Sequence, residues 1–522
     1  MERVYHVHTK TTIGKNSRFW RAAGSDDLYW LTLESAGQQM LDRMQQKDSC
    51  QFLRNHYTLN SRVIYGRQVG GEVYTEDEFG NPQYDFSRIN QIYKEFVSRG
   101  LKPIVEYDYL PPALSYQLDE HAAKRDEGMS ASDLGPKDWG KWADLLKAFT
   151  QNLVDTFGLK EVRTWYFEVW NEPDHWPKED LSTFFRIYDT FVDAVTSVDD
   201  QLRVGGPATF STSFLRDFLH HVAKGKNHIT GKTGTRIDFV SHHIYGLSGG
   251  WVHEHPLVQP TVQRFVQEVL WIQRLLKQYP ELGDVEFHLN EWGVCSNYYR
   301  TAAEYPALEY RNSEFSALFF AKLVHLLYAV EDAFQFPTSM LLYWGFSFET
   351  STNEYFRGNR DLLTAGGVPK PIQTAHEMLS LMGDHRMKVT GPKPGGSIGV
   401  MATSSENDRI ELLAYHFNEL QDVPTGTETV RIRLDELGSA QRVKATMYRL
   451  DRDHHNTYRA WERLGKPKHV SGETNETVAL LKAEGELTAD SVIEIAIDGW
   501  AAELPLTLPA HSLCFVVVEI LY

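Results

Sequence analysis

The chain has 522 residues, of which 42% are hydrophobic and 24% charged, the composition of an ordinary globular protein with room for more than one core. Its formal net charge of -17 would repel a nucleic-acid backbone and an anionic membrane surface, so we expect neither nucleic acid nor membrane as a partner. The 13 Trp, 25 Tyr and 27 Phe residues suit the apolar face of a sugar or a base, and they suit a large core equally well.

The first twenty residues, MERVYHVHTKTTIGKNSRFW, contain no apolar run of signal-peptide length, and no later run is long enough to span a membrane. The three cysteines, Cys50, Cys295 and Cys514, are far apart and lack Cys-x-x-Cys spacing, which favours a reducing compartment and no structural zinc. We therefore expect a cytoplasmic protein without a cofactor and without a bound metal.

Residues 1–15 precede the first regular pattern and could pair with the last domain. From residue 16 to 383, apolar strand-like runs alternate with segments of helical period. The runs are FWRAAG, FLRNHYTL, KPIVEYDYL, TWYFEVW, LRVGGPA, FVSHHIYG, VEFHLNEWG and MLLYWGFSF. Eight strand and helix units over this length predict an α/β fold, a (β/α)8 barrel, whose chemistry would lie at the carboxyl ends of the strands.

The helical segments show apolar stripes that we interpret as core packing. Gly100 stands where the first of these helices would end. The stripes consist of Ile89, Ile92, Tyr93, Phe96 and Val97; Trp142, Leu145, Leu146, Phe149 and Leu153; Phe184, Ile187, Phe191 and Val195; and Val262, Phe265, Val266, Val269 and Leu270.

The period changes after residue 383. Short β-branched runs separated by polar turns predict an antiparallel β-sandwich over residues 384–522. The runs are SIGVMATSS, RIELLAYHF, TVRIRL, RVKATMYRL, SVIEIAID and LCFVVVEI. Residues 455–485 interrupt them and are expected to be partly helical.

Two glutamates follow predicted barrel strands at equivalent places. Glu172, in WYFEVWNEPDHW, comes just past the fourth strand, and Glu291, in FHLNEWG, occupies the equivalent place after the seventh. Two carboxylates at one barrel rim are what glycosidic bond cleavage requires, one to donate a proton and one to attack or to activate water. Trp170 and Trp176 would keep Glu172 protonated, while hydrogen-bond donors would keep Glu291 ionised. The alternative is structural: Glu172 would cap a helix or pair with Arg163.

The segments YDFSRINQIYKEFVSRGLKPIVEYDYLPPAL, GLKEVRTWYFEVWNEPD, RIDFVSHHIYG, LLYWGFSF and YRAWERLGKPK, together with FHLNEWG, resemble glycoside hydrolase family 39. This family contains the β-xylosidases and their α-L-iduronidase relatives, barrels with glutamates on strands 4 and 7. The resemblance covers nearly the whole chain, and FEVWNEP is its most specific motif.

The resemblance implies a role for individual positions. Glu172 resembles the acid/base of the family and Glu291 its nucleophile, which implies net retention through a covalent glycosyl-enzyme. Tyr245 resembles the tyrosine that hydrogen-bonds the nucleophile, and Arg54 is expected to hold a rim carboxylate. The positions that resemble sugar contacts of the family are His56, Asn171, His243 and Trp344.

Two departures from the family pattern bear on specificity. Ser347 is followed by Phe348 where the xylosidases have acidic residues, with Glu349 and Glu354 out of register. Glu354 and Arg360 are kept as candidate substrate-binding residues. Arg360 resembles an arginine of the iduronidases that binds a uronate carboxylate, but the basic residue that these enzymes place after the sixth strand is missing from IYGLSGG. We therefore expect a terminal pentoside, most simply a β-D-xyloside, as the substrate, with an α-L-arabinoside or an iduronide as the alternative.

Two other classes of protein are alternatives to a glycosidase. His6 and His8, in VYHVHT, share one face of a strand as the metal ligands of an amidohydrolase barrel do, but they precede the first barrel strand. A non-catalytic carbohydrate-binding protein is the other competitor, although two adjacent carboxylates repel each other and give a binding site no advantage. A homo-oligomer is compatible with the sequence.

Overall fold

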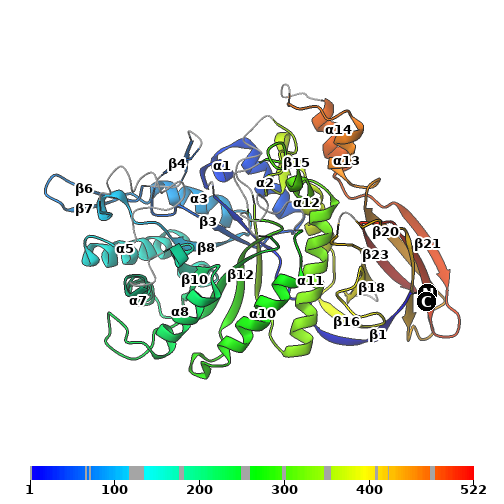
Figure 1. The fold of residues 1–522 in the computed structure, drawn as a ribbon, viewed down its shortest axis with the longest axis horizontal. Coiled ribbons are helices and arrows are strands. Elements are labelled where there is room, and N and C mark those ends of the chain that lie inside the picture. Colours follow the sequence, from blue (N-terminus) through cyan, green and yellow to red (C-terminus); the bar gives the residue numbers. More distant parts are fainter. Residues whose placement is uncertain are drawn as a thin grey trace.

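The structure of the protein is a computed structural model. It describes residues 3–26, 28–60, 62–64, 67–69, 72–116, 135–175, 181–247, 259–296, 301–345, 354–405, 409–420, 423–470 and 476–522. Figure 1 shows two parts, a barrel surrounded by helices and a separate β-sheet layer beside it. Among the residues just given, no helix combines the length and the apolar character needed to cross a membrane.

Eight parallel strands close into a barrel, which confirms the predicted fold class. Each strand pairs with the next one along the chain, and the last pairs with the first in the register Trp344 to Gly24. The strands are β2 (Ala22–Ser25), β3 (Phe52–Asn55), β8 (Lys102–Tyr107), β9 (Tyr166–Val169), β10 (Arg203–Thr209), β11 (Phe239–Tyr245), β12 (Glu286–Gly293) and β13 (Met340–Trp344). Every one of the eight predicted runs overlaps one of these strands, and six contain it entirely.

Helices follow the barrel strands and form the outer layer (Figure 1). They are α1 (Leu28–Leu33) and α2 (Ser35–Gln46), α3 (Ser87–Val97), α5 (Trp139–Phe157) with α6 (Leu159–Val162), α7 (Leu181–Val198), α8 (Thr212–Lys224), α10 (Gln263–Leu276), α11 (Glu314–Phe334) and α12 (Pro371–Ser380). Most bury one stripe against the barrel, as the apolar periodicity predicts. By contrast, α11 is buried almost all round, because it lies between the barrel and the second sheet.

The second part is one sheet of nine strands, mostly antiparallel, that folds over a core of its own. Its spatial order is β21 (Ser491–Ala496), β20 (Arg442–Leu450), β23 (Ser512–Leu521), β18 (Arg409–His416), β17 (Ile398–Ser404), β16 (His385–Thr390), β1 (Arg3–Lys15), β19 (Glu428–Asp435) and β22 (Ala502–Leu508). Alternate side chains of β19 and β22 point into this core and the others into solvent, the pattern of a sheet covered on one face. This arrangement is the β-sandwich that the sequence predicts.

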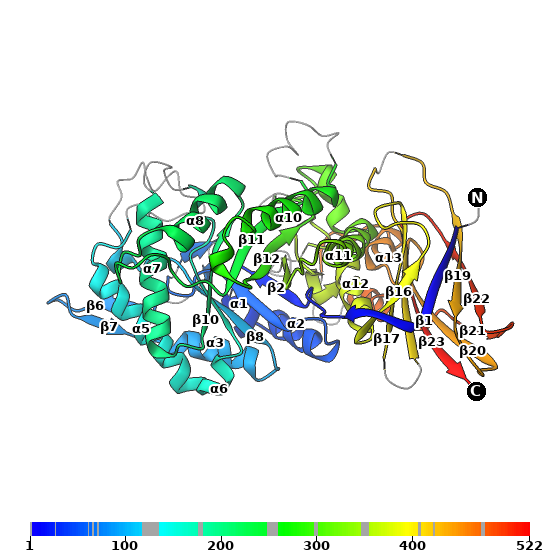
Figure 2. The ribbon, with the colours of Figure 1, turned by 90° about the horizontal axis from the view of Figure 1, so that it is seen from below.

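The first strand of the chain belongs to this sheet and not to the barrel. β1 pairs antiparallel with β16 and parallel with β19, and Figure 2 shows it running from the barrel to the far side of the sheet. His6 lies 2.9 Å from Asp435 and His8 lies 3.1 Å from Thr390. The two histidines are therefore surface residues of the sandwich, and the amidohydrolase alternative is wrong.

The segment that interrupts the sandwich is partly helical, with α13 (Thr457–Arg463) and α14 (Glu476–Glu484). These helices pack on the segment that follows β13 through a small apolar cluster that contains Phe356, Tyr458 and Leu481. Arg459 of α13 forms an ion pair with Glu314 at the start of α11, at 2.8 Å. The insertion therefore joins the sandwich to the side of the barrel where β13 ends.

Candidate active site

Glu172 and Glu291 lie at the carboxyl ends of β9 and β12, on one rim of the barrel. Glu172 follows β9, which ends at Val169. Glu291 lies within β12, close to its end at Gly293, and not beyond the strand as expected. The residue is 6% exposed, so most of its surface is covered.

His243 connects the two glutamates. It pairs with Glu291 in the register of β11 and β12, and its Nδ1 lies 2.9 Å from Glu172 Oε1 and 3.5 Å from Glu291 Oε2. One carboxylate oxygen of each glutamate and one imidazole nitrogen all lie within 4.8 Å of one another. Burial lowers the pKa of His243 to about 3, although Glu291 opposes this shift, so the imidazole is neutral at neutral pH. One small group could therefore contact both carboxylates at once.

The two oxygens of Glu291 have different surroundings. Oε1 accepts a hydrogen bond from the Tyr245 hydroxyl at 2.6 Å, and Arg360 donates to that same hydroxyl while its Nη1 lies 4.0 Å from Oε1. Oε2 lies 3.6 Å from Arg54 Nη1 and accepts no hydrogen bond from the residues that the structure describes. The carboxylate is thus held through Oε1, while Oε2 is buried between Arg54 and His243.

The backbone around Glu172 has an unusual conformation. Trp170 has a φ of 71° and Glu172 one of 46°, values that non-glycine residues rarely adopt. The Glu172 amide donates to the Ala208 carbonyl oxygen at 2.9 Å, and Asp174 accepts from the Ser211 amide at 2.9 Å. These bonds tie the turn after β9 to the end of β10, which fixes the direction of the Glu172 side chain. Its carboxylate therefore faces His243, and the alternative that it pairs with Arg163 is wrong, since Arg163 pairs with Asp199.

A buried ionic network lies beneath the two glutamates. Arg54 is fully buried, donates to Glu168, and lies 2.9 Å from a carboxylate oxygen of Glu106. Burial alone would lower the pKa of Arg54, but Glu106 and Glu168 outweigh it and raise the pKa above its usual value. Asn290, next to Glu291 on β12, donates to both oxygens of Glu168. The network therefore fixes the strand that carries Glu291, which agrees with the structural role expected for Arg54.

Three further predicted residues lie around the same mouth. Asn171 accepts a hydrogen bond from Arg54 Nη2 at 3.1 Å, and His56 Nδ1 lies 3.1 Å from both oxygens of Glu106. The rings of His56 and Trp344 lie 4.4 Å apart at 37°, and the Arg54 guanidinium is 5.3 Å from the Trp344 ring centroid. Together with Glu172, Glu291, His243, Tyr245 and Arg360, they form one connected group.

The Trp344 ring occupies a space that exists because its neighbour on β2 is glycine. A Cβ added to Gly24 would overlap carbon atoms of the Trp344 ring, since it would lie far inside the van der Waals contact distance. We expect Gly24→Ala to displace this ring and to lower the stability of the protein by about 1 to 3 kcal/mol, as overpacking does. Thermal unfolding would measure the loss. Gly426→Ala, where an added Cβ meets no atom within 4 Å, is the matched control. Equal melting temperatures for both variants would contradict this packing.

Glu354 is the predicted site residue that the structure places elsewhere. Its carboxylate lies 3.4 Å from Arg357 and 3.5 Å from Lys468, and its backbone forms a bridge with His469 of the sandwich insertion. These contacts give Glu354 a role between the two parts of the molecule. Trp176, Ser347, Phe348 and Glu349 lie outside the described residues.

The barrel mouth also contains two of the residue groups whose spacing could hold a metal ion. These groups are Glu172, His243 and Glu291, and His56, Glu106 and Asp108. Asp108 already accepts hydrogen bonds from the Tyr57 and Thr58 amides, and Glu106 already pairs with Arg54. An ion in the first group would fill the space between the two glutamates. We therefore assign a metal to neither.

Sequence reasoning missed Glu106 and Glu168, which hold Arg54. Both are fully buried on barrel strands, where each interrupts an apolar run, in KPIVEYDYL and TWYFEVW. A charged residue inside a predicted barrel strand almost always has a buried partner. That signal is present in the sequence and points to the arginine on a neighbouring strand.

A barrel with two carboxylates this close at its carboxyl rim defines the class of glycoside hydrolases. The model of the family "Glycosyl hydrolases family 39" matches residues 4–489, and the chain belongs to this family. It is therefore a glycoside hydrolase.

Individual relatives are distant but extend over the whole chain. The β-xylosidase of Caldicellulosiruptor saccharolyticus is 24% identical over 97% of this chain and 96% of its own. The crystal structure of a monomeric β-xylosidase from Caulobacter crescentus CB15 is 23% identical, covers 100% of both chains and superimposes with a TM-score of 0.76. A structure of the bacterial orthologue of human α-L-iduronidase is 20% identical, covers 99% of this chain and 84% of its own, and has a TM-score of 0.78. At these identities the two structures establish the fold.

Proposed function

We propose that the protein is a retaining exo-glycosidase that removes terminal pentosides, with β-D-xylosides as its preferred substrates. The observation that carries the retaining mechanism is the approach of Glu172 and Glu291, whose carboxylate oxygens come within 4.8 Å of each other. Retaining glycosidases have carboxyl groups about 5 to 5.5 Å apart, whereas inverting ones leave about 6.5 to 9.5 Å for a water molecule. An oxygen of each carboxylate within 4.8 Å of the other favours the shorter, retaining separation.

In the first step, Glu291 attacks the anomeric carbon while Glu172 gives its proton to the departing glycosidic oxygen. The bond from the anomeric carbon to that oxygen breaks, and a glycosyl ester of Glu291 forms. Tyr245 and Arg360 stabilise the Glu291 carboxylate through Oε1 before the attack. Because Tyr245 keeps its own proton, the hydroxyl remains a donor throughout; burial raises its pKa well above the usual value.

In the second step, Glu172, now ionised, takes a proton from a water molecule that attacks the anomeric carbon from the side of the departed group. The ester bond breaks and Glu291 returns to its carboxylate form. The neutral His243 beside both side chains accommodates Glu172 in either protonation state, since each ring nitrogen can be a donor or an acceptor. The sugar leaves with the configuration that it had in the substrate.

A pentoside is supported by the full-length match to a β-xylosidase and by the aromatic wall of His56 and Trp344. Arg360 supports a uronide as the second candidate, because its guanidinium lies at the catalytic carboxylate and could also reach a sugar carboxylate. Arg360 donates a hydrogen bond to the Tyr245 hydroxyl and so helps to hold Glu291. Because this role needs no sugar carboxylate, it favours a neutral sugar as the substrate.

Hydrolysis of aryl β-D-xyloside, aryl α-L-arabinosides and an aryl α-L-iduronide tests the choice of sugar. We expect the highest kcat/KM on the xyloside, and NMR of the first product should show β-xylose before it mutarotates. Turnover of the iduronide alone would replace the pentoside by a uronide. Initial release of α-xylose would reject the covalent intermediate without affecting the choice of sugar.

We also propose that the enzyme works in the cytoplasm. Cys50, Cys295 and Cys514 are all free and buried, which suits a protein that needs no disulfide bond. Fractionation of the source cells would test this location, and recovery of the protein outside them would reject it.

A further inference from the structure

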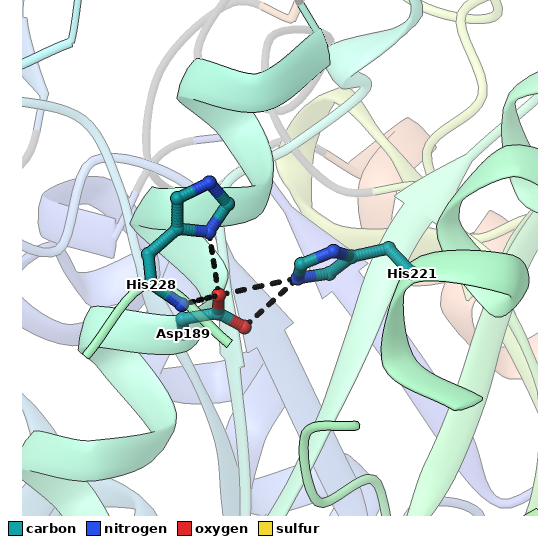
Figure 3. A group of neighbouring side chains, drawn as sticks. All are labelled: Asp189, His221 and His228. Atoms are coloured by element: carbon teal, nitrogen blue, oxygen red, sulfur yellow. Dashed lines mark hydrogen bonds and ion pairs between the residues drawn. The ribbon is translucent and has the colours of Figure 1, made fainter. Parts of the chain in front are cut away.

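A cluster of one aspartate and two histidines lies on the outer helices of the barrel. Asp189 comes from the middle of α7, His221 from the last turn of α8, and His228 from the loop between α8 and β11 (Figure 3). The carboxyl end of α8 leads back to the start of the next strand, so the cluster lies toward the face of the barrel opposite to Glu172 and Glu291. The reaction therefore does not use it.

The three side chains converge on one point. His221 Nε2 lies 3.0 and 3.2 Å from the two oxygens of Asp189, and His228 Nδ1 lies 2.7 Å from Asp189 Oδ2. One atom from each residue falls within 4.8 Å of the other two. Figure 3 shows both rings pointing one nitrogen at the carboxylate from different sides. Three segments of the chain thus contribute two imidazole nitrogens and one carboxylate to the same small volume.

The carboxylate is held in this direction by two other donors. The Thr235 hydroxyl donates to Asp189 Oδ1 at 2.6 Å, and the His228 backbone amide donates to Oδ2 at 2.8 Å. Outer donors that orient a carboxylate in this way are characteristic of metal sites. They would remain in place if an ion took the position between Asp189 and the two rings.

The charge of the cluster is uncompensated when its histidines are neutral. Asp189 is fully buried, and its carboxylate accepts hydrogen bonds from His221, His228 and Thr235. Among the ion pairs of the described residues, its only partners are the two histidines. A divalent ion would supply the positive charge that no lysine or arginine supplies in these ion pairs.

We propose that Asp189, His221 and His228 form a binding site for a divalent transition metal of the zinc class. Zinc takes nitrogen and carboxylate oxygen at about 2.0 to 2.2 Å, which places tetrahedral ligands about 3.3 Å apart, so the present spacings need to open by only a few tenths of an ångström. Each histidine would offer the nitrogen that now faces Asp189 and carry its proton on the other one. The His228 side chain is 32% exposed, which gives the ion an entry path and a fourth position for water.

The function of such an ion is structural. It would add a further link between α7, α8 and the loop before β11, which already meet through the hydrogen bonds of Asp189 and through ring contacts such as Phe185 with His221. Stability rather than turnover is the property that should respond, because binding to the folded state alone stabilises a protein.

The test uses the full-length protein without an affinity tag, freed of metal by a chelator and titrated with Co²⁺ and Zn²⁺. We expect one Co²⁺ per chain with the visible absorption of a tetrahedral site, displacement by Zn²⁺, and a higher melting temperature with either ion. His228→Ala should lower the affinity more than tenfold and remove the rise in melting temperature. His220→Ala, which changes the exposed neighbour of His221 on α8, should leave both unchanged.

Glu291→Ala is the second control, because Glu172, His243 and Glu291 form the competing group. Unchanged cobalt absorption in this variant assigns the ion to the outer site, and its loss overturns the proposal. An absence of cobalt absorption in the unmodified protein would also overturn it. In that case, if His228→Ala without metal melts at a lower temperature than the unmodified protein, the cluster stabilises the fold through its hydrogen bonds only.

Discussion

Replacement of Glu291 by Ala is expected to abolish turnover of every substrate, lowering kcat by a factor on the order of 10⁴ to 10⁶, as loss of a nucleophile does in other hydrolases. The effect should be this large because no other described carboxylate lies within reach of Glu172 across the mouth: Glu106 and Glu168 are committed to Arg54 beneath it. Steady-state hydrolysis of an aryl β-D-xyloside measures the loss.

Azide should restore part of this activity, because the small anion can occupy the space of the missing carboxylate and attack the anomeric carbon. The product would be the α-glycosyl azide, inverted relative to the β-glycoside, which NMR distinguishes from the sugar. Glu281→Ala, at an exposed glutamate on the opposite side of the barrel, is the control and should be fully active. A Glu291→Ala variant that retains near-normal rates would show that another group attacks the sugar.

Replacement of Glu172 by Ala is expected to act selectively on the leaving group. General acid catalysis contributes about 10²- to 10⁴-fold, so we expect a loss in this range for alkyl xylosides or xylobiose, whose departing oxygen needs a proton. A dinitrophenyl xyloside departs without that proton, and its first step should be nearly normal. Its glycosyl-enzyme should then accumulate, because the water in the second step lacks its base. Burst kinetics would reveal this accumulation.

Azide distinguishes the two glutamates. In Glu172→Ala it should attack the glycosyl-enzyme and yield a β-glycosyl azide, the opposite anomer to that from Glu291→Ala. Glu172→Gln preserves the size of the side chain and should show the same dependence on the leaving group. An equal loss for activated and unactivated substrates in both variants would assign Glu172 a positioning role only, through its contact with His243.

The barrel and its two glutamates could be predicted because local signals and global fold agree. Each barrel strand is a short apolar run followed by a helix with one apolar stripe, as in KPIVEYDYL and the α5 stripe around Trp142 and Phe149. Once the strands are numbered, Glu172 and Glu291 lie at the carboxyl ends of the fourth and the seventh strand. Because the strands of the barrel are parallel, these ends lie on the same rim. The pairing of Tyr245 with Glu291 follows from the register of β11 and β12, which a single sequence does not specify.

Two strands of the sandwich, β16 and β22, were not predicted, for separate reasons. β22 contains Pro505, which a sequence pattern assigns to a turn, but β22 is an edge strand, where a missing amide is tolerated. β16 has too few apolar residues for a clear alternation. For β1, the sequence left open a pairing of residues 1–15 with the last domain, and the structure shows β1 paired with β16 and β19. Which strands are the partners could not be predicted, because they lie far along the chain and leave no local signal.

The cluster of Asp189, His221 and His228 was also missed, because its members are separated by whole elements of the barrel. Only the histidines are near each other in sequence, and two histidines seven positions apart match no metal-ligand motif on their own. The packing of α7 beside α8 brings the carboxylate to them.

The position of β1 has a consequence for biosynthesis. Both of its neighbours, β16 and β19, emerge from the ribosome only after the entire barrel has been made, so the first strand must wait unpaired until the last quarter of the polypeptide appears. Closing so long a loop is entropically slow, and an exposed strand edge invites association with other nascent chains. Truncation at the end of the barrel would make that waiting state permanent. The barrel and the sandwich therefore depend on each other during folding, although each has a core of its own.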